Sequence, residues 1–345
     1  MIEKITRREM LRRAGAAGGA LAVGGMAPAL AKDPRRPLLY GAGIIWGRWV
    51  NLPRDYDDRQ MDLLKSLGGT VCSASFDWVD VEPTPGKWDW SYADHTVDAA
   101  QKRKLKQVAF VGNTARWALP TGVSPNLTYR FPPRDNCESA FYNYCRTAAA
   151  RYRGRVEMFQ FWNEPNGCGW VKDGCANADQ FALYTRWLKV AYAGLKAGNP
   201  HCIVAAGALD YNQGVKDGYK YIEGMYKNGA YGHFDTISIH PYGEPLHWEA
   251  LSDTHRVMSE NGDSHKGIWI TEYGWSDSKG EGPAEKLREV LRRLSTPEFS
   301  YVKLANYLCV TDLPGKGEQY GLADRDLHPR PIAMAFREMA TGAQV

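Results

Sequence analysis

The chain has 345 residues, of which 44% are hydrophobic, 24% charged and 12% aromatic. This is a globular composition, which excludes a disordered or fibrous chain, and the length suits one large domain. The net charge of +4 includes four arginines within the first thirteen residues, so the remainder is nearly neutral. We therefore expect no nucleic-acid partner.

The N-terminal segment, residues 1–31, is typical of an export signal. It has a basic start, a weakly apolar Gly/Ala stretch and "ALA" at 29–31, which predicts cleavage before Lys32. "TRREMLR" at 6–12 resembles a twin-arginine signal, which implies a periplasmic or extracellular location in a bacterium. The alternatives are an amphipathic first helix, disfavoured by the many glycines, and a membrane anchor, disfavoured by the short length. No later segment is long and apolar enough to span a bilayer.

The seven cysteines leave at least one thiol unpaired. Cys168 and Cys175 bracket the short loop "CGWVKDGC", and in an exported protein they could form a disulfide or stay reduced. Neither a CxxC pair nor an HExxH motif occurs, so the sequence predicts no zinc site. We expect no metal and no organic cofactor.

Eight apolar, β-rich runs alternate with segments of helical period after residue 37. For example, Phe181, Tyr184, Leu188, Ala191 and Leu195 share one helix face, and Pro283 lies in the first turn of a later helix. Eight strand–helix units in order predict an α/β fold, a single (β/α)8 barrel over residues 32–345 without an accessory β-sandwich. The predicted strands are 38–43, 70–76, 106–111, 156–162, 203–208, 234–240, 267–272 and 301–308.

A doubly wound nucleotide-binding fold is the rival interpretation. Gly41, Gly43 and Gly47 follow the first strand and loosely match a dinucleotide fingerprint. However, "RWVNLPRDYDD" follows, and its proline and lack of helical period do not suit a phosphate-binding helix. We therefore prefer the barrel.

Two carboxylates fall at strand ends of this predicted barrel, where catalytic groups of the fold lie. Glu164 follows the fourth strand in "FQFWNEPN", and Glu272 follows the seventh in "IWITEYGWS". Two carboxylates in one cavity suit glycoside hydrolysis, because mutual repulsion separates their pKa values into an acid and a base. Taken singly, Glu164 could be an ordinary loop residue and Glu272 a helix-cap acid.

"WNEPN" and "TEYGW" resemble the motifs of retaining glycoside hydrolases of clan GH-A, closest to family 39-type bacterial glycosidases and exopolysaccharide hydrolases. The stretch "FDWVDVEPTPGKWDWSYAD" at 76–94 is similar to the segment after strand two in that group. The resemblance implies that Glu164 is the acid/base and Glu272 the nucleophile. It also implies that Asn163 binds the sugar 2-hydroxyl and that His240 and Tyr242 lie near the nucleophile.

The chain departs from that pattern in two places. "TVCSASF" has Ser73 where the clan has an arginine that bonds the nucleophile, so Arg48 or Arg116 would have to replace it. Family 39 xylosidases also tend to carry a β-sandwich that this sequence lacks, which weakens a xylosidase assignment.

Several of the other candidates have structural interpretations. Asn163 could bond only the turn backbone, and His240 could be a core histidine with satisfied hydrogen bonds. Packing is also the usual role of a tryptophan. Among the aromatic residues we expect Trp117, Trp275 and Tyr307 to contact sugar.

Together these observations predict an exported retaining glycoside hydrolase that acts on an oligosaccharide or polysaccharide. Its two carboxyl groups should lie about 5–5.5 Å apart. The alternatives are a non-catalytic polysaccharide-binding barrel and a transglycosylase of envelope or exopolysaccharide glycans. The sequence leaves the sugar, the linkage and the oligomeric state open.

Overall fold

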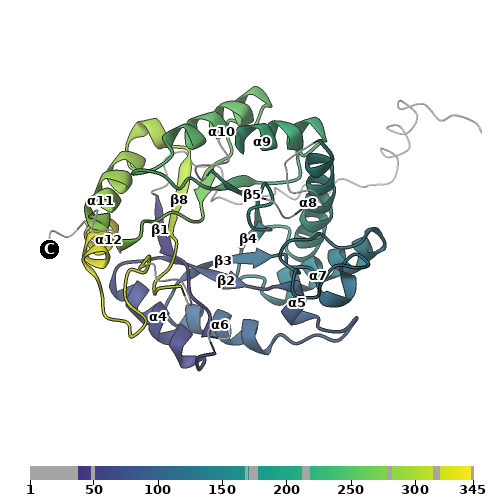
Figure 1. The fold of residues 1–345 in the computed structure, drawn as a ribbon, viewed down its shortest axis with the longest axis horizontal. Helices are drawn as coiled ribbons and strands as arrows, with labels where there is room; N and C mark the ends of the chain where they lie inside the picture. Colours follow the sequence, from purple (N-terminus) through teal and green to yellow (C-terminus); the bar gives the residue numbers. More distant parts are fainter. Residues whose placement is uncertain are drawn as a thin grey trace, which may run out of the picture.

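The chain folds around a closed barrel of parallel strands. The computed structural model describes residues 38–47, 51–167, 170, 178–211, 218–277, 282–313 and 319–342. Within these ranges eight strands pair in chain order, and β8 pairs with β1 to close the barrel. Figure 1 shows the strands at the centre with the helices around them. The predicted (β/α)8 barrel is therefore confirmed.

Each predicted strand run overlaps one observed strand. The strands are β1 Leu39–Ala42, β2 Val71–Ser75, β3 Lys106–Val111, β4 Met158–Phe161, β5 Ile203–Asp210, β6 Thr236–His240, β7 Ile268–Ile270 and β8 Val302–Tyr307. The main difference is β5, which runs past residue 208. A register shift between Gly207 and Leu209 inserts an extra residue, and the strand then continues so that Asp210 pairs with His240.

The helices follow the strands as an outer ring. The longer ones are α4 Asp55–Ser66, α6 Ser91–Lys102, α7 Glu138–Arg151, α8 Ala178–Gly198, α9 Gly218–Lys227, α10 Trp248–Glu260, α11 Pro283–Leu294 and α12 Pro331–Thr341. The short ones are α5 Trp78–Val81, η1 Arg116–Ala118, η2 Asp135–Cys137 and η4 Pro297–Phe299. The predicted helix that carries Leu188 is α8, and Pro283 opens α11 as expected.

The barrel interior changes from apolar to polar along the strands. A buried cluster inside it includes Val71, Met158, Trp269 and Leu304. Side chains two residues apart on a strand share a face, so each strand's next inward position is two residues further on. Those positions hold polar residues that line a cavity, namely Ser73, Gln160, Thr271 and Asn306. The alternation in the sequence therefore places polar groups at the carboxyl ends of the strands.

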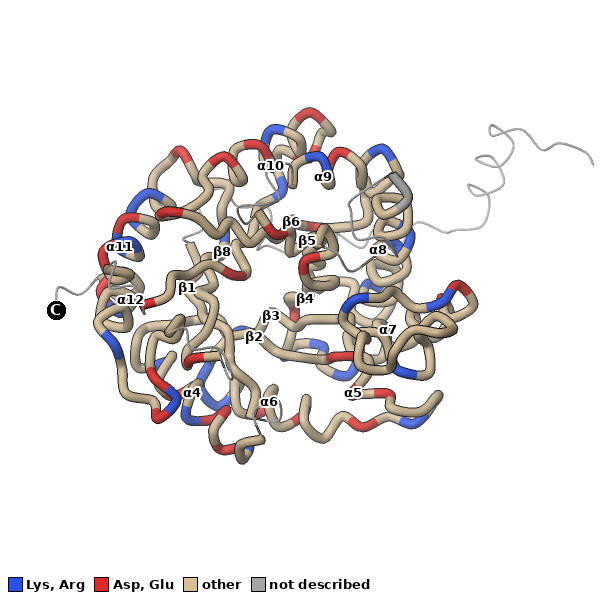
Figure 2. Tube along the Cα trace, viewed as in Figure 1, with Lys and Arg blue, Asp and Glu red and all other residues tan. Residues whose placement is uncertain are grey.

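Charge is distributed unevenly around this frame. Figure 2 shows Lys and Arg mostly on the surrounding helices, whereas several Asp and Glu positions lie over the barrel centre. None of the helices in the described ranges is long and apolar enough to cross a membrane. The same ranges contain no separate β-sandwich domain.

Candidate active site

Glu164 and Glu272 both lie just beyond a strand at the carboxyl end of the barrel. β4 ends at Phe161 and β7 ends at Ile270, so each glutamate belongs to the first residues of the following loop. The side chain of Glu164 is 36% exposed and that of Glu272 is 31% exposed. Both carboxylates are thus partly withdrawn from water at the face where catalytic groups of this fold gather.

The loop that carries Glu164 is held in an unfavourable backbone conformation. Trp162 has φ 65° and Glu164 has φ 46°, in the left-handed region that costs a side-chain-bearing residue roughly 1–2 kcal/mol. Two backbone hydrogen bonds of 3.0 Å hold the loop, from Trp162 N to Val111 O and from Glu164 N to Ala208 O. Strain of this kind gathers at functional sites, because the surrounding structure must enforce it.

The two glutamates are close enough to act on one bond. A carboxylate oxygen of each, together with a ring nitrogen of His240, lie within 4.8 Å of one another. Retaining glycosidases have carboxyl groups about 5–5.5 Å apart, and inverting enzymes have them at roughly 6.5–9.5 Å. One oxygen of each glutamate thus approaches the other to within the shorter of these two spacings.

His240 lies between the two carboxylates and is completely buried. Its Nδ1 is hydrogen-bonded to Glu164 Oε1 at 2.9 Å and lies 3.7 Å from Glu272 Oε2, while Nε2 is 3.1 Å from Thr271 Oγ1. Burial is the largest influence and lowers the pKa of His240. The negative charges of Glu272 and Glu164 outweigh it, so the pKa of His240 is raised overall. An imidazolium here is stabilised by both catalytic candidates.

Tyr242 is the hydrogen-bond partner of Glu272. Its hydroxyl donates to Glu272 Oε2 at 3.0 Å. Burial raises the pKa of Glu272, and the charge of Glu164 adds to that effect, whereas His240 and the Tyr242 hydroxyl oppose it. The pKa of Tyr242 itself is raised well above its ordinary value by burial, so the phenol stays a donor.

His240 and Tyr242 lower the pKa of Glu272, which is the effect expected of the arginine that the resemblance implies. Ser73 instead accepts a hydrogen bond from the Ile44 N–H at 2.9 Å. Arg116 is exposed on η1, and Arg48 lies outside the described residues. Among the residues described, the groups that stabilise ionised Glu272 are therefore His240 and Tyr242.

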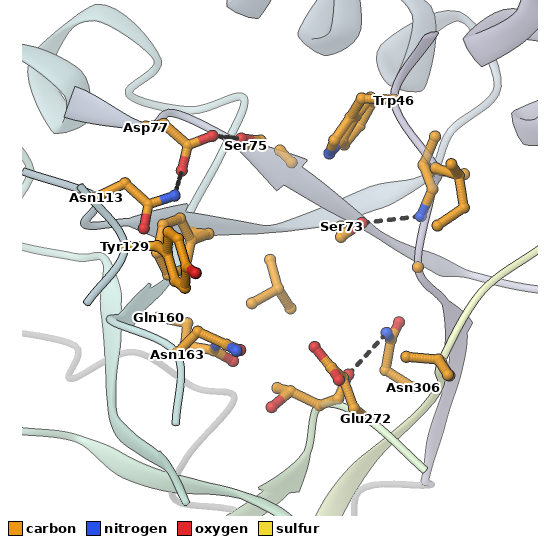
Figure 3. Close-up of a pocket in the computed structure, with 18 of the residues that line it drawn as sticks. Trp46, Ser73, Ser75, Asp77, Asn113, Tyr129, Gln160, Asn163, Glu272 and Asn306 are labelled. Atoms are coloured by element: carbon orange, nitrogen blue, oxygen red, sulfur yellow. Dashed lines mark hydrogen bonds between the residues drawn. The ribbon is translucent and has the colours of Figure 1, made fainter. Parts of the chain in front are cut away.

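A cavity of about 340 Å³ opens beside Glu272. Asn163, which is exposed just after β4, lines this cavity together with Glu272. The residue predicted to bind the sugar 2-hydroxyl and the predicted nucleophile therefore border the same cavity. Figure 3 shows Asn163 and Glu272 with other polar residues around the space. Further lining residues that the sequence did not single out are Asp77, Asn113, Tyr129, Gln160, Thr271 and Asn306.

The three predicted aromatic contacts are not on the wall of this cavity. Tyr307 is fully buried against Tyr273 and Trp275, which leaves no face for a sugar to stack on. Trp275 is 5% exposed, and its indole N–H donates to the carbonyls of Gly243 and Pro245. Trp117 is half-buried and donates to the Glu82 carbonyl. In all three, the aromatic ring packs the loops of the site.

The remaining predictions concern metal binding, the export signal and the possible disulfide. Glu164, His240 and Glu272 together offer the donor atoms of a cation site, and Nδ1 of His240 lies 2.9 Å from Glu164 Oε1 and 3.7 Å from Glu272 Oε2. Residues 1–31, the predicted signal, and both cysteines of the possible disulfide, Cys168 and Cys175, lie outside the described residues.

One protein family matches this chain by sequence. Residues 135–319, more than half of the chain, match the family described as glycosyl hydrolase catalytic core. This match spans both glutamates.

Three solved structures superimpose on about nine tenths of the chain. A family 39 glycoside hydrolase from Bacteroides cellulosilyticus WH2 has a TM-score of 0.69 and 23% identity, covering 90% of this chain and 64% of that one. A monomeric β-xylosidase from Caulobacter crescentus CB15 has a TM-score of 0.68 and 17% identity, covering 90% of this chain and 69% of that one. The family 39 enzyme from Xanthomonas axonopodis pv. citri has a TM-score of 0.66 and 17% identity, covering 90% of this chain and 67% of that one.

At these identities the structures show a common fold, and the chain spans about two thirds of their length. They agree with the resemblance to clan GH-A, family 39-type enzymes that the sequence predicts. The chain belongs to the glycosyl hydrolase catalytic core family.

Proposed function

We propose that the protein is a retaining glycoside hydrolase that cleaves O-glycosidic bonds of an oligosaccharide or polysaccharide. Glu272 is the nucleophile and Glu164 the acid/base. The observation that carries this proposal is the separation of the two carboxylates, with an oxygen of each within 4.8 Å of the other. This approach supports direct attack by one carboxylate, which is the arrangement of retaining enzymes.

The first half-reaction forms a glycosyl-enzyme. A Glu272 oxygen attacks the anomeric carbon while the bond from that carbon to the leaving oxygen breaks. Glu164 gives its proton to the leaving oxygen, so an alcohol departs and Glu164 becomes a carboxylate. The charge of Glu272 is consumed in the ester bond.

The second half-reaction reverses these roles. Glu164, now ionised, takes a proton from a water that attacks the anomeric carbon, and the ester to Glu272 breaks. Both glutamates return to their starting states. The two displacements occur on opposite faces of the sugar and each inverts the anomeric carbon, so together they retain its configuration.

His240 and Tyr242 serve this cycle as positioning residues. Nδ1 of His240 is hydrogen-bonded to Oε1 of Glu164 and lies 3.7 Å from Oε2 of Glu272. Tyr242 donates to the same Glu272 oxygen that faces His240, Oε2. Both interactions favour the ionised nucleophile against the effect of burial, which is the role that an arginine would otherwise have.

The direct test is a substrate panel followed by NMR. Structures similar to this chain are described as a β-xylosidase and an exo-β-1,4-mannosidase, so the panel includes 4-nitrophenyl β-xyloside, β-mannoside and β-glucoside with matching polysaccharides. We expect hydrolysis of at least one compound, with the first product in the anomeric configuration of the substrate. Inverted product would contradict the mechanism, and no hydrolysis with intact binding would favour a binding barrel.

Export through the twin-arginine route is a second proposal, which rests on the sequence of residues 1–31. Replacing Arg7 and Arg8 by lysine should retain the protein in the cytoplasm of a bacterial host, whereas the wild-type chain should reach the periplasm. Fractionation and immunoblotting measure the difference, and equal export of both would refute the route.

A further inference from the structure

We propose that Tyr129 is a sugar-stacking platform on the wall of the cavity and sets how tightly the protein holds its carbohydrate. This inference rests on the proposed function and adds a substrate-binding residue to it. Tyr129 lies in the loop between β3 and α7, far in sequence from both glutamates. It lines the same cavity as Glu272 and Asn163.

The ring of Tyr129 is unusually exposed for this protein. Among the described residues, the large hydrophobic side chains that are exposed are Tyr129, at 51%, and Tyr231, at 60%. A single exposed aromatic residue is ordinary on a protein surface. Tyr129 differs from Tyr231 because it borders a cavity beside the candidate nucleophile, whereas Tyr231 lies in the turn before β6, on the opposite end of the barrel.

The backbone on both sides of Tyr129 is anchored to the end of β3. Thr114, which is completely buried, donates its N–H to Thr128 O at 2.9 Å and its hydroxyl to Phe131 O at 2.5 Å. One side chain and its backbone therefore hold the residues before and after the tyrosine. Because the loop is already ordered, little conformational entropy is lost when a ligand binds to the ring of Tyr129.

Arg130 fixes the ring itself. Its Nε donates to the Tyr129 hydroxyl at 3.2 Å, and its guanidinium carbon lies 5.4 Å from the ring centroid. These contacts restrict the rotation of the phenol and leave it as part of the cavity wall. The arrangement is that of a preformed aromatic surface in a binding site.

The neighbours of Tyr129 complete a surface that fits a sugar ring. Figure 3 shows it beside Asn113 and Gln160, on the side of the cavity away from Asn306. Asn113 donates to Asp77 Oδ1 at 2.6 Å, so a buried carboxylate and two amides stand next to the phenol. A pyranose has an apolar C–H face and a rim of hydroxyls, which match an aromatic ring flanked by hydrogen-bonding groups.

The test compares Tyr129→Ala with Tyr231→Ala, the matched exposed tyrosine outside the site. On the 4-nitrophenyl glycoside that the wild type hydrolyses fastest, Tyr129→Ala should raise KM about five- to tenfold, the loss expected for one aromatic face. The kcat should change less than KM, and Tyr129→Phe should recover most of the loss because it keeps the ring. Tyr231→Ala should leave both constants unchanged.

A binding measurement separates this inference from the catalytic proposal. Electrophoresis in native gels that contain xylan or glucomannan reports binding without hydrolysis when each tyrosine variant also carries Glu272→Gln. Retardation that is lost with Tyr129→Ala and kept with Tyr231→Ala supports the platform, even if the wild type hydrolyses nothing.

The platform is refuted by any of three results. These are equal retardation of the two variants, no retardation of Glu272→Gln in either gel, or an unchanged KM of Tyr129→Ala on a substrate that the wild type cleaves. The last result would leave the catalytic proposal intact, so the two failures are distinguishable.

Discussion

Removing the Tyr242 hydroxyl should shift the pH range in which the protein is active. In Tyr242→Phe, Glu272 loses the 3.0 Å hydrogen bond that favours its ionised form. A hydrogen bond to a charged group contributes about 1.5–3 kcal/mol, and a donor at 3.0 Å from a carboxylate lies at the weaker end, so about 1.5 kcal/mol is expected. This corresponds to about a tenfold smaller ratio of ionised to protonated Glu272 at any one pH.

The sign of the shift follows from the role of Glu272. The nucleophile must be ionised, and burial already raises its pKa, so activity falls on the acid side as Glu272 takes up a proton. Loss of the donor raises that pKa further and moves the acid limb to higher pH. The assay is kcat/KM against pH on one aryl glycoside, because this quantity reports the free enzyme.

Tyr273→Phe is the matched control. Tyr273 follows Glu272 directly, is completely buried, and its hydroxyl has no hydrogen-bond partner among the described residues. Tyr273→Phe also removes a phenolic hydroxyl, in the residue next to Glu272, but this hydroxyl does not bond Glu272. The acid limb of the pH profile should therefore not move. A limb that stays in place in Tyr242→Phe, or moves to lower pH, would refute the proposed support of Glu272.

Three further predictions concern the acid, the buried charge and the cavity loop. Glu164→Ala should lower kcat/KM, which reports formation of the glycosyl-enzyme, about 10²–10⁴-fold on glycosides with poor leaving groups and much less on dinitrophenyl glycosides. Steady-state kinetics would show the difference, and equal losses of kcat/KM would contradict the acid role. Glu272→Gln should raise Tm at pH 7 but not near pH 4, because a carboxyl group whose pKa is raised in the folded state destabilises the fold only when it is ionised. Calorimetry at both pH values tests this, and a lower Tm at pH 7 would contradict it. Thr114→Val leaves the Phe131 carbonyl without its donor, so urea unfolding should show a loss of about 1–2 kcal/mol, with a raised KM through Tyr129; a stable variant with wild-type KM would show that the loop does not depend on Thr114.

The barrel could be predicted because its signal is local and repeated. Each strand is a short apolar run that ends at a turn residue, and β4 and β7 both lead into a glutamate motif. Most predicted strands are one or two residues too long at an end, and β5 alone runs past its predicted end, because a register shift inside an apolar run leaves no mark in composition. Motif and strand order together were enough to bring Glu164 and Glu272 to one face.

The surroundings of the two glutamates were harder to predict. His240 was expected near the nucleophile, yet its hydrogen bond is to Glu164, a partner that depends on how adjacent strands are staggered. Tyr129 gave no signal, because a tyrosine in a long loop becomes significant only when Thr114 anchors that loop beside the cavity. Nearness in sequence to Glu272 is also a poor guide to contact with sugar. Trp275 lies three residues past Glu272, but its indole N–H donates to the backbone carbonyl of Gly243.

Trapping the glycosyl-enzyme tests the central claim most directly. The intact protein would be incubated with dinitrophenyl 2-deoxy-2-fluoro-β-glycosides of the sugars in the panel, which slow the second displacement, and then digested for mass spectrometry. The account predicts one added fluorosugar, attached to the peptide that contains Glu272, and none in Glu272→Gln. An adduct on another residue, or turnover of the natural glycoside with no adduct at Glu272, would contradict it.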